Sequence, residues 1–364
     1  MLLDEDLAAW LTLSLLPGLS GADLRRLLAA FGEPRAVLAA GRAALVHHVP
    51  ETAAAAIKHG VSDAALAAVG AWLDDPVHRV ITLADAQYPR QLLQVSDPPP
   101  LLYATGRVDL LSRPALAIVG SRNASAQGAA DAEAFSRTLS DAGLTIVSGL
   151  ALGIDAAAHR GGLAGAAGSV AVLGTGADIV YPARNRALAH ELAAHGALIS
   201  EYPLGTRPLA GNFPRRNRLI SGLALGCLVV EAAIDSGSLI TARLAAEQGR
   251  DVFAIPGSIH SPLAKGSHAL IKQGAKLVES ARDVLEELRL PVPEDRTPPA
   301  ALPEAADPRA RRLLDALGQA PCDLDTLAHR AGLPAADVAA LLTQLELDGY
   351  IAALPGGLFQ RVWR

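Results

Sequence analysis

The sequence predicts an α/β protein with a doubly wound, mostly parallel sheet, an N-terminal helical domain and a C-terminal winged helix. Short apolar stretches alternate with helical patterns through the middle of the chain, and each runs into glycine, serine or a charge. The chain ends in a strand, a Pro-Gly-Gly turn and a second strand. With 364 residues, 51% of them hydrophobic, it can build two or three domains and a sizeable core.

Residues 1–75 are predicted to form a domain of short helices. Apolar residues recur at helical spacing in 6–16, in 22–32 and in 33–40. The turn Pro17–Gly21 between the first two helices resembles a SAM-like or helix-hairpin-helix unit, whose hairpin amides can hold a DNA phosphate. Ser20 stands where that hairpin pattern wants glycine, so a plain helical interaction module is an equal alternative.

Residues 76–290 are predicted to form the α/β domain. Continuous apolar strands that alternate with helices indicate a parallel sheet covered on both faces. In that architecture ligands bind beyond the carboxyl ends of the strands, so the residues after each strand matter most. The predicted strands are 115–120, 144–149, 169–174, 197–201, 226–232 and 251–257.

Residues 291–306 hold five prolines in sixteen positions and are predicted to be a semi-rigid linker. Residues 307–364 follow as three helices and a β-hairpin, which is a winged-helix pattern. Its expected recognition helix carries Asp337, Glu346 and Asp348 but no basic residue, and only Gln344 suits a base edge. We therefore expect this domain to contact protein or another subunit and not to read duplex sequence.

Composition excludes several classes of protein. The formal net charge of -5 excludes a uniformly basic polyanion binder, so any nucleic-acid role needs a local patch. The two cysteines, Cys227 and Cys322, show no metal spacing and are expected to be free thiols. An acidic N-terminus and the lack of a long apolar run predict a soluble, cytoplasmic protein without membrane contact. We expect no metal and no cofactor.

The first predicted strand of the α/β domain ends in Gly120, Ser121 and Arg122. Glycine allows a ligand to approach the backbone closely, and Ser121, the free amides of the next helix and the Arg122 guanidinium can donate to an anion. No G-x-G-x-x-G is present, which disfavours a dinucleotide site. The turn therefore favours phosphate binding, with surface pairing of Arg122 to a carboxylate as the alternative.

Positive charge is concentrated in the segment 211–222, around Asn217 and beside Phe213. From Tyr202 to Val230 there is no Asp or Glu, and an external anion is the expected counter-charge for Arg215, Arg216 and Arg218. Phe213 could stack a base, a contact suited to single strands. Alternatively Arg216 or Arg218 pairs with Glu201 or Glu231; we expect one of the three arginines to do so.

Later strand ends add weaker candidates. Ser238 is expected to cap the helix that starts at Leu239 and to offer an anion site there. Lys265 would extend the basic rim. Ile271 and Leu277 flank an apolar patch, which either packs internally or forms a subunit interface.

Asp155 and His159 lie four residues apart on one face of a predicted helix. A hydrolase would use them as a base and its orienter. The favoured alternative is structural, with Asp155 capping the helix and His159 hydrogen-bonded inside the domain, because no nucleophile elbow adjoins them.

Taken in order, the strand ends "VGSR", "SGLALGIDAAAH", "FPRRNRLISGL", "EAAIDSGSLITA", "GRDVFAIPG" and "LIKQGA" resemble the DNA-processing protein A (DprA/Smf) family over residues 85–290. The resemblance implies an extended Rossmann-like domain that binds single-stranded DNA, protects incoming DNA during natural transformation and helps to load the RecA recombinase. It implies no enzymatic activity. It places Arg122 and the arginines of "FPRRNR" in the DNA pocket, and a homodimer interface at His268, Ile271 and Leu277.

Two other classes compete with this interpretation. A Rossmann-like nucleoside-phosphate hydrolase would use Asp155, His159 or Glu231, but "EAAIDSGSLIT" lacks the Pro-Gly-Gly-x-Gly-Thr loop usual there. A winged-helix transcription factor with an α/β sensor is disfavoured by the acidic recognition helix.

Overall fold

The computed structural model describes residues 3–292, 307–318, 321–354 and 356–362. Most of the predicted Pro-rich linker lies outside them. Within the described residues, no helix is both long enough and apolar enough to cross a membrane.

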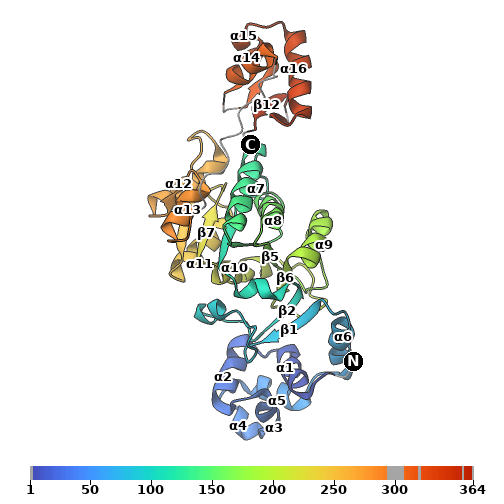
Figure 1. Cartoon of the computed structure of the whole chain (residues 1–364). Helices are drawn as coiled ribbons and strands as arrows, with labels where there is room; N and C mark the ends of the chain where they lie inside the picture. Colours follow the sequence, from blue (N-terminus) through green and yellow to red (C-terminus); the bar gives the residue numbers. More distant parts are fainter. Residues whose placement is uncertain (1–2, 293–306, 319–320, 355, 363–364) are drawn as a thin grey trace.

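Six helices form the N-terminal part, gathered at one end beside β1 and β2 (Figure 1). Ser20 is the N-cap of the second helix, in a capping box: its Oγ accepts from the Asp23 amide at 3.1 Å, and Asp23 Oδ2 accepts from the Ser20 amide at 3.3 Å. Asp23 thus takes up the Ser20 amide, and the choice between a helix-hairpin-helix unit and a plain helical module remains a prediction. The helices are α1 Glu5–Leu15, α2 Gly21–Phe31, α3 Pro34–Ala39, α4 Arg42–Leu45, α5 Glu51–His59 and α6 Asp63–Leu73.

A nine-stranded sheet runs through the middle of the chain, in the order β1-β2-β6-β5-β4-β3-β7-β8-β9. All six predicted strands are present and pair in parallel. The strands β1 and β2 were not predicted; they are antiparallel, and β2 joins β6 through pairs such as Tyr103 with Ser200. The short edge strand β9 was not predicted either. The strands are β1 His78–Thr82, β2 Leu101–Gly106, β3 Ala115–Val119, β4 Thr145–Ser148, β5 Ser169–Val172, β6 Ala197–Ser200, β7 Gly226–Val229, β8 Asp251–Ala254 and β9 Lys276–Leu277.

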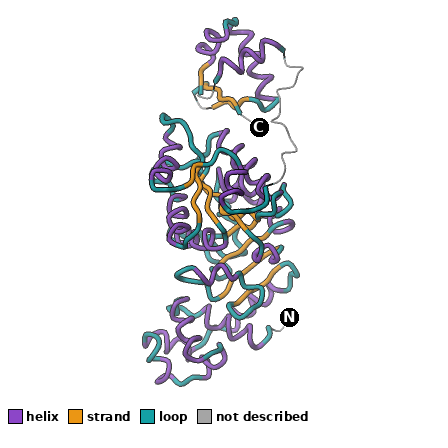
Figure 2. The backbone as a smooth tube through the Cα atoms, turned by 60° about the vertical axis from the view of Figure 1, so that its left-hand side comes forward, coloured by secondary structure: helices purple, strands orange, loops and turns teal. Residues whose placement is uncertain are grey.

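Helices cover both faces of this sheet, as the apolar strands predict (Figure 2). Along β3, Leu116 and Ile118 face a core built with α7, α8 and α13, whereas Ala117 and Val119 face a core built with α10 and α11. The predicted doubly wound α/β fold is therefore confirmed. The helices are α7 Ala126–Asp141, α8 Ile154–Ala164, α9 Arg186–His195, α10 Asn212–Leu223, α11 Ser238–Glu247, α12 Lys265–Lys272 and α13 Ala281–Glu287.

The strand order reverses at β3. From β3 the chain moves outward through β4, β5 and β6, and later returns to place β7 on the opposite side of β3. Beyond the carboxyl ends of β3 and β7 the following segments diverge and leave a crevice, which is where open α/β sheets bind ligands.

The C-terminal part has a core of its own, which includes Leu313, Leu327, Leu342 and Ile351. The predicted three helices and hairpin are present, and a short strand, β10, adds to the hairpin to give the sheet order β10-β12-β11. The elements are α14 Pro308–Leu317, β10 Cys322–Asp323, α15 Leu324–Ala331, α16 Ala335–Leu347, β11 Ile351–Leu354 and β12 Leu358–Arg361.

Candidate nucleic-acid interface

A cavity of about 630 Å³ lies at the carboxyl ends of β3 and β7, between the starts of α8, α10 and α11. The structure brings most of the predicted site together at this switch point. The residues of the predicted DNA-binding set that line the cavity are Gly120, Ser121, Arg122, Phe213, Arg216, Asn217 and Ser238.

The Gly120–Arg122 turn is held tightly against its neighbours. A Cβ at Gly120 would lie 2.6 Å from Ile154 Cγ1 and 2.7 Å from the Glu231 carbonyl oxygen. The Ser121 amide donates to that same oxygen at 2.6 Å, and the Ile154 amide donates to the Ser121 carbonyl at 3.1 Å. Only glycine permits this approach, so the turn presents its polar groups to the cavity in a fixed geometry.

Arg122 is the exposed cation of the cavity. Its Cζ lies 5.9 Å from the centroid of the Phe213 ring, a cation–π contact. Within the described residues it forms no ion pair. The structure therefore does not support the alternative in which a surface carboxylate neutralises Arg122. The N–H donors of the Arg122 guanidinium remain available to a ligand.

Arg216, by contrast, is buried beneath the cavity, with 4% of its surface exposed. Its Nη1 donates to the Gly149 carbonyl at 2.8 Å and also to the Val172 carbonyl. Burial lowers the pKa of Arg216 to about 10, and the charge of Asp155 opposes that change. Burial likewise raises the pKa of the Asp155 carboxyl, and Arg216 reduces the effect. Arg216 thus fixes the loop after β4 and the end of β5 through their carbonyl groups.

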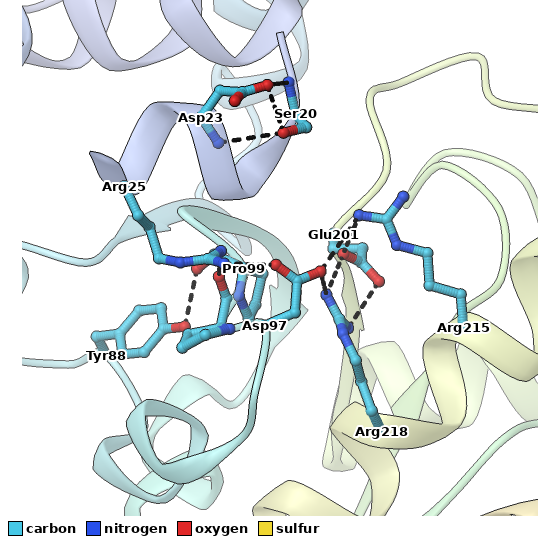
Figure 3. Close-up of polar contacts among 10 residues, drawn as sticks. Ser20, Asp23, Arg25, Tyr88, Asp97, Pro99, Glu201, Arg215 and Arg218 are labelled. Atoms are coloured by element: carbon cyan, nitrogen blue, oxygen red, sulfur yellow. Dashed lines mark hydrogen bonds and ion pairs between the residues drawn. The ribbon is translucent and has the colours of Figure 1, made fainter. Parts of the chain in front are cut away.

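Arg218 and Arg215 lie outside the cavity, in a cluster of charges that reaches α2 (Figure 3). Arg218 donates to the two Glu201 oxygens at 2.9 and 2.7 Å, and Arg215 Nη2 lies 3.8 Å from the same carboxylate. Asp97 adds a second carboxylate, 3.5 Å from Arg218 and 3.6 Å from Arg215.

The alternative in which Arg218 pairs with Glu201 is confirmed, and Arg215 adds a second, longer pairing that was not expected. The segment is free of acid in sequence but not in space, since Glu201 at the end of β6 and Asp97 before β2 fold against α10. Glu231 instead accepts from the Ser125 amide at 2.9 Å and the Ser125 hydroxyl at 2.6 Å, at the start of α7.

The helix α11 begins one residue earlier than predicted. Gly237 is its N-cap, so the expectation that Ser238 would cap it was wrong; Ser238 is the first helical residue, and its hydroxyl lies 2.7 Å from that of Ser236. Asn217 reaches across from α10, with its Nδ2 3.5 Å from the Gly237 carbonyl. These groups form a second polar wall facing the Gly120–Arg122 turn.

Lys265 does not reach this cavity. Its Nζ donates to the Ile259 carbonyl at 2.6 Å and is not among the groups that line the cavity. A role in DNA binding at its edge remains a prediction.

The two residues that a hydrolase would use are placed differently: Asp155 lines the cavity and His159 does not. His159 is fully buried, accepts from the Leu150 amide at 3.2 Å and lies 2.8 Å from the Ser169 hydroxyl. Burial lowers its pKa to about 3, aided by the charges of Arg216 and Arg160. Asp155 accepts from the Gly149 and Ala151 amides and so braces the loop before α8, whose N-cap is Gly153, so the expected helix cap was wrong. The described residues include no cluster of three or more metal-ligating side chains.

Sequence reasoning missed Tyr181, which also lines the cavity. Its ring centroid lies 5.5 Å from that of Phe213, with 40° between the ring planes, and 47% of the residue is exposed. The signal was an aromatic residue in "GTGADIVYP", shortly after a strand whose end points at the site.

The predicted dimer residues gather near the β9 edge of the sheet. A His268 ring nitrogen lies 3.0 Å from the Gly257 carbonyl, and Ile271 is half-buried on the same helix, α12. Leu277, 43% exposed, lies on β9, the last strand of the sheet. Their role in an interface remains a prediction.

Residues 79–289 match the family model described as DNA recombination-mediator protein A, and residues 297–357 match the DprA winged helix domain. The chain is similar to Protein Smf of Escherichia coli, 47% identical over 79% of this chain and 78% of the relative. It is similar to the DNA processing protein DprA of Streptococcus pneumoniae, 48% identical over 57% of this chain and 73% of the relative.

Two solved structures agree with these matches. The X-ray structure of DprA from Streptococcus pneumoniae superposes with a TM-score of 0.68 at 38% identity, over 77% of this chain and 97% of that one. A structure that describes the single-stranded DNA binding mode of DprA from Helicobacter pylori superposes with a TM-score of 0.53 at 29% identity, over 58% of this chain and 96% of that one. With the two family models, these relatives and these solved structures in agreement, the chain belongs to the DNA-processing protein A (DprA/Smf) family.

Proposed function

We propose that this protein binds single-stranded DNA through the switch-point cavity and acts in DNA processing during transformation. The observation that carries the proposal is Arg122, whose guanidinium forms no ion pair among the described residues and lies over Phe213 beside a rigid glycine turn. A phosphodiester is the anion that such a cation and a set of backbone amides suit best. The Helicobacter pylori relative, which binds single-stranded DNA, supports the same ligand.

The binding is sequence-independent, because these donors recognise phosphate and not base edges. The family resemblance adds that the protein shields incoming strands and helps to load RecA onto them. It acts without catalysis and without a cofactor. His159 supports this, since its ring is enclosed away from the cavity and held neutral.

A second copy of the chain completes the functional unit. The β9 edge, with His268, Ile271 and Leu277 beside it, is the surface we assign to the homodimer. An exposed strand edge with an apolar side chain is suited to pairing with a partner. Sedimentation of Leu277→Glu against wild type tests this: a shift from dimer to monomer is expected, and an unchanged dimer would place the interface elsewhere.

The winged helix serves protein contact. Gln344, the residue of α16 that could read a base edge, donates to both Asp348 carboxylate oxygens at 3.1 Å. Leu347 beside it is 79% exposed. A helix face that combines acids with an exposed leucine repels a duplex and suits a protein surface.

The binding test uses a fluorescent strand of about 20 nucleotides and its duplex across a salt series. Wild type should prefer the single strand and lose affinity steeply with salt. Arg122→Glu should weaken binding by about tenfold or more, because charge-assisted hydrogen bonds contribute roughly 1.5–3 kcal/mol.

Arg79→Glu, an exposed charge reversal on β1, is the matched control and should bind like wild type. Weak, salt-insensitive binding that ignores Arg122 would contradict the proposal. A strand-exchange assay that requires RecA to displace a single-strand-binding protein then tests the loading role.

A further inference from the structure

The aromatic ring that the sequence offers for base stacking already has close neighbours in the structure. Phe213 packs on Gly174: a Cβ there would lie 2.7 Å from Phe213 Cδ1 and 2.9 Å from Cε1. Arg122 covers the ring from the cavity, 5.9 Å from its centroid. The ring is half-buried as a result. Phe213 therefore acts as a support that holds Arg122 in place.

Tyr181 is placed differently. It lines the same cavity and is 47% exposed, among the more exposed large apolar side chains of the described residues. Its only ring partner there is Phe213, whose plane is tilted 40° away, and its hydroxyl has no hydrogen bond among the described groups. Tyrosine in this state leaves apolar surface in water next to a cavity, which is typical of a binding residue.

The lining of the cavity has two chemically distinct parts. The polar part comes from the Gly120–Arg122 turn with Asn123, and from Ser236 and Ser238 at the start of α11. The other part, the apolar wall, is exposed and includes Tyr181, Pro208, Ala210 and Pro214. A nucleotide has the same division, with a charged phosphate and a flat base, so the two parts of the lining can bind its two ends together.

From this we infer a nucleobase subsite on the wall formed by Tyr181, Pro208, Ala210 and Pro214, with Tyr181 as its stacking ring. The inference rests on the proposed binding of single-stranded DNA and adds a base contact to the phosphate contact. The ligand is the face of any one base of the strand. Stacking tolerates every base, so the subsite adds affinity without sequence preference. It also favours single strands, because a paired base cannot present its face.

The test compares a 20-nucleotide strand with the same backbone carrying abasic tetrahydrofuran residues throughout. Tyr181→Ala should weaken binding of the normal strand by about 5- to 150-fold, the range expected for losing one base–aromatic stack. It should leave the abasic strand bound as by wild type, and Tyr181→Phe should keep normal binding. Leu93→Ala removes a similarly exposed apolar side chain, 54% exposed, away from the cavity and should change neither affinity.

A fluorescence variant gives an independent readout. In Tyr181→Trp, emission should be quenched by the normal strand and not by the abasic one, since quenching requires contact with a base. The subsite is refuted if Tyr181→Ala binds the normal strand as wild type does, or if it weakens both strands equally with unchanged circular dichroism.

Failure of the proposed function has a different pattern. In that case Arg122→Glu would leave the affinity for the abasic strand unchanged. If affinity for the abasic strand depends on salt and on Arg122, but Tyr181→Ala does not change affinity for the normal strand, only the base subsite is refuted and the proposed function stands.

Discussion

Arg218 and Glu201 are joined by two hydrogen bonds, of 2.9 and 2.7 Å, in a stretch that looks purely basic in the sequence (Figure 3). Both side chains are more than nine-tenths buried. The pair adjoins Asp97, which Arg25 of α2 binds at 2.6 Å. The helix that carries the candidate DNA contacts is therefore anchored, through its other face, to the N-terminal helices.

Arg218→Ala should lower the free energy of unfolding by about 3–5 kcal/mol, because it leaves the Glu201 carboxylate buried without its partner. Arg215→Ala is the matched comparison. Arg215 is 53% exposed and lies 3.6 Å or more from either carboxylate, so its loss should cost about 0–1 kcal/mol. Urea unfolding of the two variants measures the difference. Similar losses in both would mean that Glu201 is solvated when Arg218 is absent.

Asp97→Asn should destabilise the protein by about 1 kcal/mol at neutral pH, a small value because Asp97 is about one-third exposed. Burial alone would raise the pKa of Asp97, but the Arg25 hydrogen bond and the charges of Arg218, Arg25 and Arg215 outweigh it and lower that pKa. A lowered carboxyl pKa contributes stability above the unfolded value, near 3.8, and loses it as pH falls through the folded pKa. The stabilities of wild type and variant should converge as pH falls below 3.8, through the lowered pKa of Asp97. A constant gap would assign the effect to packing.

His159 should make the protein acid-sensitive in a higher pH range. Its pKa falls from 6.5 to about 3 on folding, so below pH 6.5 the unfolded chain takes up a proton that the folded chain excludes. Stability therefore falls as pH drops from about 6.5 toward 3, by up to about 1.4 kcal/mol per pH unit. His159→Gln replaces the ring with an amide that does not titrate. The variant should therefore take up one proton fewer on unfolding, and its free energy of unfolding should fall less steeply with pH in this range. Parallel pH curves for the two proteins would mean that the ring is protonated in the folded state.

The sequence predicted the strands well and the partners of side chains less well, for a physical reason. Continuous apolar strands, and the glycine turns that follow them, are local patterns, so the strand at 115–120 and the five other parallel strands could be predicted. Asp97 lies 121 residues before Arg218, and Tyr181 lies 32 before Phe213. Which charge neutralises which, and which ring faces the cavity, depends on how β6, α10 and the loop after β5 cross, and spacing along the chain does not encode that.

The geometry of the candidate site depends on one further glycine, Gly153. Its φ is +74°, and a Cβ would meet the carbonyl oxygens of Ser121 and Arg122, the second at 2.7 Å. Gly153→Ala should therefore destabilise by at least about 2 kcal/mol, from backbone strain and from displacement of the Gly120–Arg122 turn. Gly143→Ala has the same strain, with a φ of +96°, but no atom within 4 Å of the added carbon, so it should cost about 1 kcal/mol.

The two glycine variants separate strain from site geometry. At temperatures where both remain folded, Gly153→Ala should weaken single-strand binding and Gly143→Ala should not. The decisive comparison is the abasic strand, which reports on the phosphate contacts alone. If Gly153→Ala and Gly143→Ala bind the abasic strand with equal affinity, the Gly120–Arg122 turn adapts to the added methyl group. Phosphate binding would then not require the close packing of this turn against Gly153 and Ile154.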